Sequence, residues 1–198
     1  MLIDGKEYDK PLFVHIPKTA GTSILNVLKD KGLDPWDRRS VEYPRGHLPL
    51  VILKQQNIVS ESVFSFAVVR NPYTRTYSCF HQFNKTNKTN ISFSEYLKNI
   101  QRNNISRITP LLHLPQYLYV INEHGVVSTD KIYRFEDLSE LKNDFDLELG
   151  FDNPGKYVIE LYNKDYTDEA IDLVQKIYKS DFDRFEYSKD FEELEDLQ

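Results

Sequence analysis

Residue types that bind phosphate-like anions follow the first apolar run of the chain. Lys18 supplies a positive charge, and the hydroxyl groups of Thr19, Thr22 and Ser23 supply hydrogen-bond donors. Gly21 lets the backbone approach a ligand closely. Because the start of a helix presents unpaired N–H groups and the positive end of its dipole, this segment predicts a cradle for a phosphate-like group.

The lysine and glycine of this segment do not have the spacing of a nucleoside-triphosphate P-loop. That motif is G-x-x-x-x-G-K-[ST], in which the lysine follows the second glycine. Here Lys18 comes three residues before Gly21, and the first glycine of the motif is absent. A Lys-Thr-Gly turn can also be a simple helix cap, so this segment alone leaves both an anion site and a structural turn open.

A second set of anion-binding residues begins at Arg70, at the end of an apolar run expected to be a strand over 63–69. Open α/β sheets bind ligands at this edge. Asn71 and Pro72 are favoured at the N-cap and first position of a helix, and Ser78 lies roughly two turns along it. An arginine fork with a hydroxyl suits a second phosphate. The two segments together predict a ligand with a phosphate at both ends of a nucleoside.

Both segments are expected at strand-to-helix junctions, because strand and helix signals alternate along the chain. The predicted strands are 11–16, 63–69 and 131–135. Helices are predicted over 23–31, 48–55, 72–83 and 136–149. A further helix is predicted to begin after Ser92 and a long final one after Thr167, and residues 84–90 are predicted to form a loop. This order indicates the α/β class and predicts a three-layer, P-loop-like domain whose central, mainly parallel sheet is flanked by helices.

One domain is expected over residues 1–190, followed by an acidic, frayed tail over 191–198. The net charge of −6 makes nucleic acid and anionic membranes poor partners for the surface as a whole. Cys79 is the single cysteine, no apolar run approaches the length of a membrane span, and no metal-ligand spacing occurs. A cytoplasmic setting is therefore expected.

The second segment resembles a motif of the sulfotransferases that use 3′-phosphoadenosine 5′-phosphosulfate (PAPS). The run R-N-P-Y-x-R-x-x-S, from Arg70 to Ser78, resembles their 3′-phosphate motif, and K-T-x-G-T-S, from Lys18 to Ser23, resembles their 5′-phosphosulfate loop. Further short matches to the carbohydrate branch, which holds the heparan and chondroitin enzymes, follow in the family's order at 46–47, 113–116, 133–138 and 178–187. Together the matches cover roughly residues 11 to 190.

The resemblance implies an enzyme that moves a sulfonate group from PAPS to a hydroxyl of a carbohydrate or similar acceptor, by in-line displacement and without a metal. It implies that Lys18 is the catalytic cation and that Arg70 and Ser78 hold the 3′-phosphate, with 3′-phosphoadenosine 5′-phosphate (PAP) as product. The 5′-phosphosulfate would be held by Lys18, Thr19, Ala20, Gly21, Thr22 and Ser23.

The general base is expected to be His47, because Gly46-His47 matches the glycine-histidine pair that supplies the base in related carbohydrate enzymes. Histidine titrates near neutral pH, which suits proton removal from a hydroxyl. Glu42 is the alternative base. The expected acceptor contacts are Arg38, Arg39, Arg45, His113 and Gln116. A solvated loop is the alternative interpretation of the three arginines.

The animal relatives carry membrane anchors and disulfides, and the sequence shows a signal for neither, so a bacterial or viral cytoplasmic enzyme that acts on a glycan, a glycolipid or a small hydroxylated metabolite is expected. Three other functions stay open. They are a P-loop-type kinase that uses a nucleoside triphosphate, a non-catalytic nucleotide-binding module, and a tyrosylprotein sulfotransferase.

Overall fold

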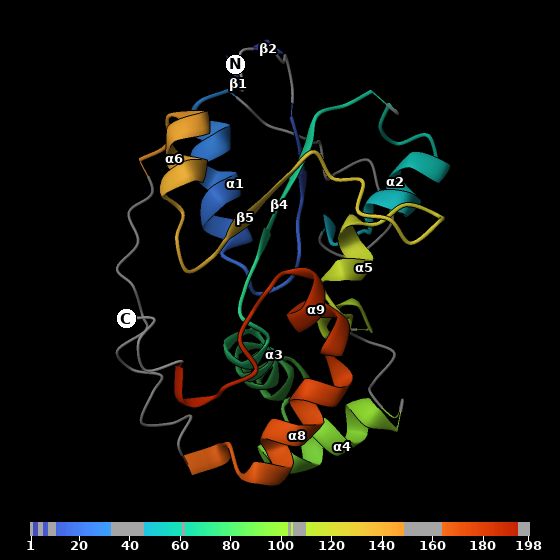
Figure 1. Cartoon of the computed structure of the whole chain (residues 1–198), viewed down its shortest axis with the longest axis vertical. Helices are drawn as coiled ribbons and strands as arrows, with labels where there is room; N and C mark the ends of the chain where they lie inside the picture. Colours follow the sequence, from blue (N-terminus) through green and yellow to red (C-terminus); the bar gives the residue numbers. More distant parts are fainter. Residues whose placement is uncertain are drawn as a thin grey trace. The chain divides into compact units, whose positions relative to one another are not determined.

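The computed structural model describes residues 2–3, 6–7, 11–32, 46–60, 62–102, 104, 110–148 and 164–193. The chain forms two compact units (Figure 1). The first unit consists of Met1–Arg70 and Gln116–Gly150, and the second of Asn71–Pro115 and Phe151–Gln198.

A three-stranded parallel sheet forms the centre of the first unit (Figure 1). Its order is β3 (Leu12–Val14), β4 (Ser65–Val69) and β5 (Lys131–Arg134), with both neighbouring pairs parallel. Every residue of β4 is buried, as a central parallel strand covered on both faces requires. The carboxyl ends of the three strands therefore lie at one edge of the sheet. A separate antiparallel pair joins β1 (Leu2–Ile3) to β2 (Lys6–Glu7).

The helices of the first unit are α1 (Gly21–Asp30), α2 (Leu50–Gln55), α5 (Tyr117–Val120) and α6 (Ser139–Phe145). Figure 1 draws α1 and α6 on one side of the strands and α2 and α5 on the other. Aromatic rings join α6 to the sheet, since the Phe145 ring lies 4.5 Å from that of Phe66 and 6.3 Å from that of Tyr133. The mixed α/β class with a parallel sheet is confirmed.

The second unit is helical. It contains α3 (Pro72–Asn87), α4 (Phe93–Gln101), the 3₁₀ turn η3 (Pro110–His113), α8 (Asp168–Ile177) and α9 (Lys179–Arg184). Its interior is rich in aromatic residues, with Tyr73, Tyr77, Phe93, Tyr96, Tyr166, Tyr178 and Phe182 buried. Side-chain caps begin three of these helices as predicted, because Asn71, Ser92 and Thr167 accept hydrogen bonds from the backbone N–H groups of residues 73, 95 and 170.

The predicted loop over 84–90 is wrong in its first half, because α3 continues to Asn87. The Asn87 side chain donates to the Phe83 carbonyl at 2.9 Å, and Lys88 takes a left-handed conformation with φ 54° that ends the helix. Local side-chain bonds therefore offset the low helix propensity of this polar stretch.

Other helix boundaries also differ from the sequence prediction, since α1 begins two residues earlier, at Gly21, and α2 two residues later, at Leu50. Helix α6 spans Ser139–Phe145 rather than 136–149. Residues 134–137 turn, the Asp137 carboxylate accepts from the Ser139 N–H at 2.9 Å, and Asp146 ends the helix in a left-handed conformation with φ 50°. The long final helix is divided at Tyr178 into α8 and α9. Phe191, expected in the tail, lies 5.2 Å from the Tyr73 ring, and residues 194–198 lie outside the described residues.

Within the described ranges, no helix combines the length and the apolar character that crossing a bilayer requires.

Candidate functional site

The loop between β3 and α1 has an unusual backbone. Lys18 and Ala20 both have left-handed φ angles, 70° and 62°, which cost energy in residues other than glycine. Between them Thr19 is fully buried, and its hydroxyl donates to the Ile16 carbonyl at 2.9 Å. A left-handed residue followed by a helical one turns successive backbone N–H groups toward one concavity, an arrangement that binds anions. Ala20 and Gly21 form such a pair.

The first turn of α1 exposes hydroxyl groups next to these N–H groups. Thr22 and Ser23 are both exposed, and Lys18 is half-buried at the start of the loop. The loop and the first turn of the helix therefore carry a half-buried lysine and two exposed hydroxyl residues beside the N-terminus of a ten-residue helix.

Gly21 leaves room for the ring of His15, because it has no side chain. A Cβ atom at this position would lie 1.9 Å from Nε2 and 2.0 Å from Cδ2 of His15. His15 itself is buried and stacks on Phe13, with ring centroids 5.4 Å apart. The sequence suggested that the glycine admits a ligand, whereas the neighbour that the structure shows at this position is the His15 ring.

Two neighbouring substitutions in this loop should change stability in opposite directions. Gly21→Ala should lower the free energy of unfolding by about 1–3 kcal/mol, because the His15 ring must move. Ala20→Gly should raise it by about 1 kcal/mol, because glycine adopts the left-handed conformation without strain. Urea unfolding of both variants measures these changes. Since Gly→Ala in a helix ordinarily stabilises, a stabilised Gly21→Ala would show that the ring does not pack there.

His47 lies against the same loop. Its Nδ1 atom is 2.9 Å from the His15 carbonyl oxygen, and the two imidazole rings are 4.2 Å apart at their centroids. A carbonyl oxygen only accepts, so Nδ1 must carry the hydrogen, and Nε2 is then the basic nitrogen of a neutral ring. This tautomer suits a general base.

Arg70 connects the end of β4 to the loop after β3. Its Nη1 atom donates to the Lys18 carbonyl at 3.2 Å. Its guanidinium carbon lies 4.2 Å from the centroid of the Phe135 ring, at the end of β5, within the range of a cation–π contact. The structure thus brings Lys18 and Arg70, which are 52 residues apart, to one edge of the sheet. Phe135 lies in the 133–138 match found in the sequence, but its contact with Arg70 was not predicted.

Gln116 lies against the backbone of Arg70. Its side-chain oxygen accepts from the Arg70 N–H at 2.9 Å, and its amide nitrogen donates to the Arg70 carbonyl at 2.7 Å. The residue has no exposed surface. The sequence suggested an acceptor contact, whereas the structure gives this amide a main-chain partner.

Two further predicted residues, Ser78 and His113, belong to the second unit. Ser78 is half-buried on α3. His113 is 7% exposed, and its Nδ1 atom lies 2.9 Å from the Tyr96 hydroxyl. Its Nε2 atom is buried with no hydrogen-bond partner in the described part of the chain. Burial, and to a smaller extent the nearby charge of Arg75, lowers the pKa of His113 to about 4.

The lowered pKa predicts that His113 contributes to acid sensitivity. An unfolded histidine binds its proton near pH 6.5, so the unfolded state takes up a proton that the folded state excludes until about pH 4. The contribution of His113 to the free energy of unfolding should therefore be fully present above pH 6.5. It should fall by about 3 kcal/mol as the pH drops toward 4. His113→Gln should no longer show this acid-induced decrease in the free energy of unfolding. His124→Gln, a control at an exposed histidine, should still show it. Urea unfolding at several pH values measures the free energy of unfolding of each variant. The same pH dependence in wild type and His113→Gln would contradict the prediction.

Arg38, Arg39 and Arg45, together with the alternative base Glu42, lie outside the described residues. No group of three or more His, Cys, Asp or Glu side chains that could hold a metal ion occurs within the ranges that the structure describes.

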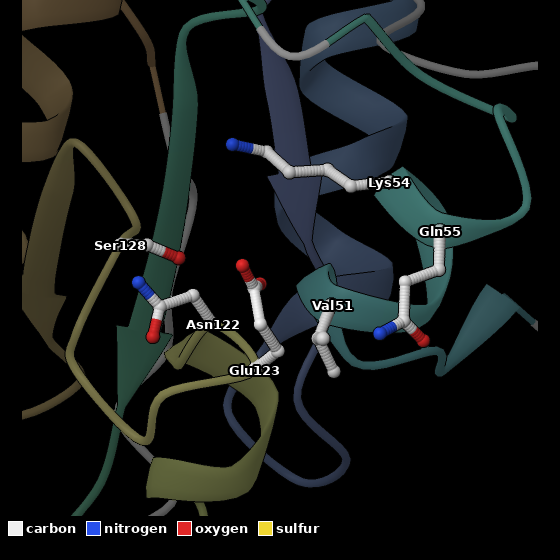
Figure 2. A pocket seen from close by; sticks show the side chains of 6 residues that line it. All are labelled: Val51, Lys54, Gln55, Asn122, Glu123 and Ser128. Carbon is white, nitrogen blue, oxygen red and sulfur yellow. The ribbon is translucent and has the colours of Figure 1, made fainter.

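A pocket of about 470 Å³ lies elsewhere on the first unit (Figure 2). One wall is a face of α2, and the other is the turn that follows α5. The lining residues are Val51, Lys54, Gln55, Asn122, Glu123 and Ser128. None of the residues predicted from the sequence lines it.

Comparisons with known proteins found no relative of this chain: no protein-family model matches it, and neither does any curated protein or solved structure.

Proposed function

We propose that this chain is a sulfotransferase, which binds PAPS and transfers its sulfonate group to a hydroxyl of a carbohydrate or similar acceptor. The observation that carries the proposal is the contact between the two anion-binding segments, in which Arg70 donates to the Lys18 carbonyl at 3.2 Å. Two cations from separate strand ends suit one ligand that carries two separate phosphates. The helices drawn on both sides of the parallel sheet support a three-layer, P-loop-like fold for the domain.

In this proposal the loop binds the 5′-phosphosulfate. The N–H groups at Ala20 and Gly21 and the hydroxyls of Thr22 and Ser23 would donate to its oxygens. Arg70 would bind the 3′-phosphate. Ser78, which follows Arg70 in the same sequence motif, is assigned to that phosphate from the sequence alone.

His47 and Lys18 would perform the transfer itself. Nε2 of His47 takes the proton of the acceptor hydroxyl while the acceptor oxygen forms a bond to sulfur. The bond between sulfur and the bridging phosphate oxygen breaks, and the electron pair stays on that oxygen, so PAP leaves. The Lys18 ammonium stabilises the negative charge that develops on the bridging oxygen.

The test is a screen of hydroxylated acceptors with PAPS that carries a labelled sulfonate group. Label should move to at least one glycan, glycolipid or small hydroxylated metabolite with the wild-type chain, and Lys18→Ala and His47→Ala should each slow the transfer by at least about 100-fold. Binding of PAP without transfer to any acceptor would instead indicate a non-catalytic nucleotide-binding module. Phosphoryl transfer from ATP with magnesium would indicate a kinase.

A further inference from the structure

We infer that Gln116 is a positioning residue, which fixes Arg70 at the end of β4 so that its guanidinium group is held ready for an anion. The inference rests on the proposed function for the identity of that anion, the 3′-phosphate of PAP, but the positioning itself rests on contacts within the first unit. No sequence pattern predicts a contact between Gln116 and Arg70, which are 46 residues apart.

Arg70 lies one residue past the end of β4. The last ladder contact there is the Phe135 N–H, which donates to the Val69 carbonyl at 2.7 Å. The Arg70 N–H and C=O need partners of their own, because buried backbone polar groups are costly when they are left unpaired. A carboxamide presents the same donor and acceptor pair as a peptide group. The Gln116 side chain therefore supplies both bonds and extends the ordered edge of the sheet by one residue.

Fixing this backbone also fixes the direction of the Arg70 side chain. Its guanidinium face rests on the Phe135 ring, and one edge points to the Lys18 carbonyl. The plane of the guanidinium group is thus defined by contacts from the ends of β4 and β5 and from the loop after β3. Such preorganisation strengthens anion binding, because the side chain loses less freedom when the ligand arrives.

Gln116 acts only through Arg70 in this scheme, since it has no exposed surface with which to contact a ligand. This distinguishes it from Lys18 and Arg70, which are half-buried and reach the surface.

A double-mutant cycle tests the inference. PAP affinity is measured by calorimetry for wild type, Gln116→Met, Arg70→Ala and the double variant. Gln116→Met keeps the length of the side chain and removes both hydrogen bonds, so it should weaken PAP binding about tenfold. In the Arg70→Ala background the same change should have no further effect, because its only route to the ligand is gone. Equal losses in both backgrounds would show that Gln116 acts on the fold and would overturn the inference.

A spectroscopic readout separates this inference from the proposed function. The ¹⁵Nε–¹Hε signal of Arg70 reports the order of its guanidinium group without any ligand. It should shift and broaden in Gln116→Met and shift less in Gln116→Glu, which retains the acceptor for the Arg70 N–H. The matched change Gln175→Met, on α8 in the second unit, should leave it unchanged. An unmoved signal in Gln116→Met overturns the inference, whereas a moved signal in a chain that fails to bind PAP upholds the positioning and refutes only the ligand.

Discussion

Replacing His47 by alanine is expected to lower kcat for sulfonate transfer by about 100- to 10,000-fold, the range that a general base contributes, with donor affinity unchanged. The reason is the hydrogen bond from Nδ1 to the His15 carbonyl, which makes Nε2 the basic nitrogen. Without this nitrogen the acceptor hydroxyl keeps its proton and attacks sulfur poorly. Initial rates with labelled PAPS, together with calorimetry for PAP, measure the two effects separately.

The matched control for this prediction is His47→Gln. A glutamine amide can still donate to the His15 carbonyl, but it has no nitrogen that can take a proton. His47→Gln should therefore preserve the fold of the loop and lose as much kcat as His47→Ala. Retained turnover in either variant would move the base elsewhere, with Glu42 as the first candidate.

Replacing Lys18 by methionine is expected to lower kcat by about 100- to 1,000-fold, as the loss of one group that stabilises transition-state charge does in other enzymes. Lys18 lies in the loop between β3 and α1, beside the helix N-terminus that would hold the 5′-phosphosulfate. Methionine keeps the length of the side chain and removes its charge, so the bridging oxygen would leave without a cation. The measurement is the rate of labelled sulfonate transfer at saturating donor.

Lys29 provides a charge-matched control on the last turn of the same helix. It is exposed, and Lys29→Met should transfer sulfonate at the wild-type rate. Lys18→Met with unimpaired turnover would show that its ammonium group does not meet the leaving phosphate. Equal losses in both variants would show that the net charge of the loop and helix, rather than the position of Lys18, matters.

The sequence was sufficient to predict the elements on either side of the site. Short apolar runs indicated β3, β4 and β5 to within about two residues at each end, which is the usual uncertainty of such boundaries. Cap signals at Asn71, Ser92 and Thr167 marked the helix starts correctly, because an N-cap bond joins residues only two or three apart. Local chemistry determines such features, and local chemistry is visible in a sequence.

The contacts that organise the site could not be predicted in this way. The bond from His47 to the His15 carbonyl spans 32 residues, and the bonds between Gln116 and Arg70 span 46. The contact of Phe135 with Arg70 depends on the pairing of β4 with β5. Only the Phe135 contact follows from the order of strands in the sheet, whereas the other two depend on where His47 and the residue before α5 pack against it. The sequence named Lys18, His47, Arg70 and Gln116 as site residues, but it assigned Gln116 to the acceptor rather than to Arg70.

Calorimetry of PAP against ATP with magnesium tests most directly whether Lys18 and Arg70 serve one bis-phosphorylated nucleoside. PAP should bind without any metal, and Arg70→Ala should weaken that binding far more than it weakens binding of adenosine 5′-phosphate, which lacks the 3′-phosphate. Binding of ATP with magnesium but not of PAP would contradict the account. So would an equal loss of affinity for PAP and for adenosine 5′-phosphate in Arg70→Ala, because the edge of the sheet at Lys18 and Arg70 would then not hold a sulfonate donor.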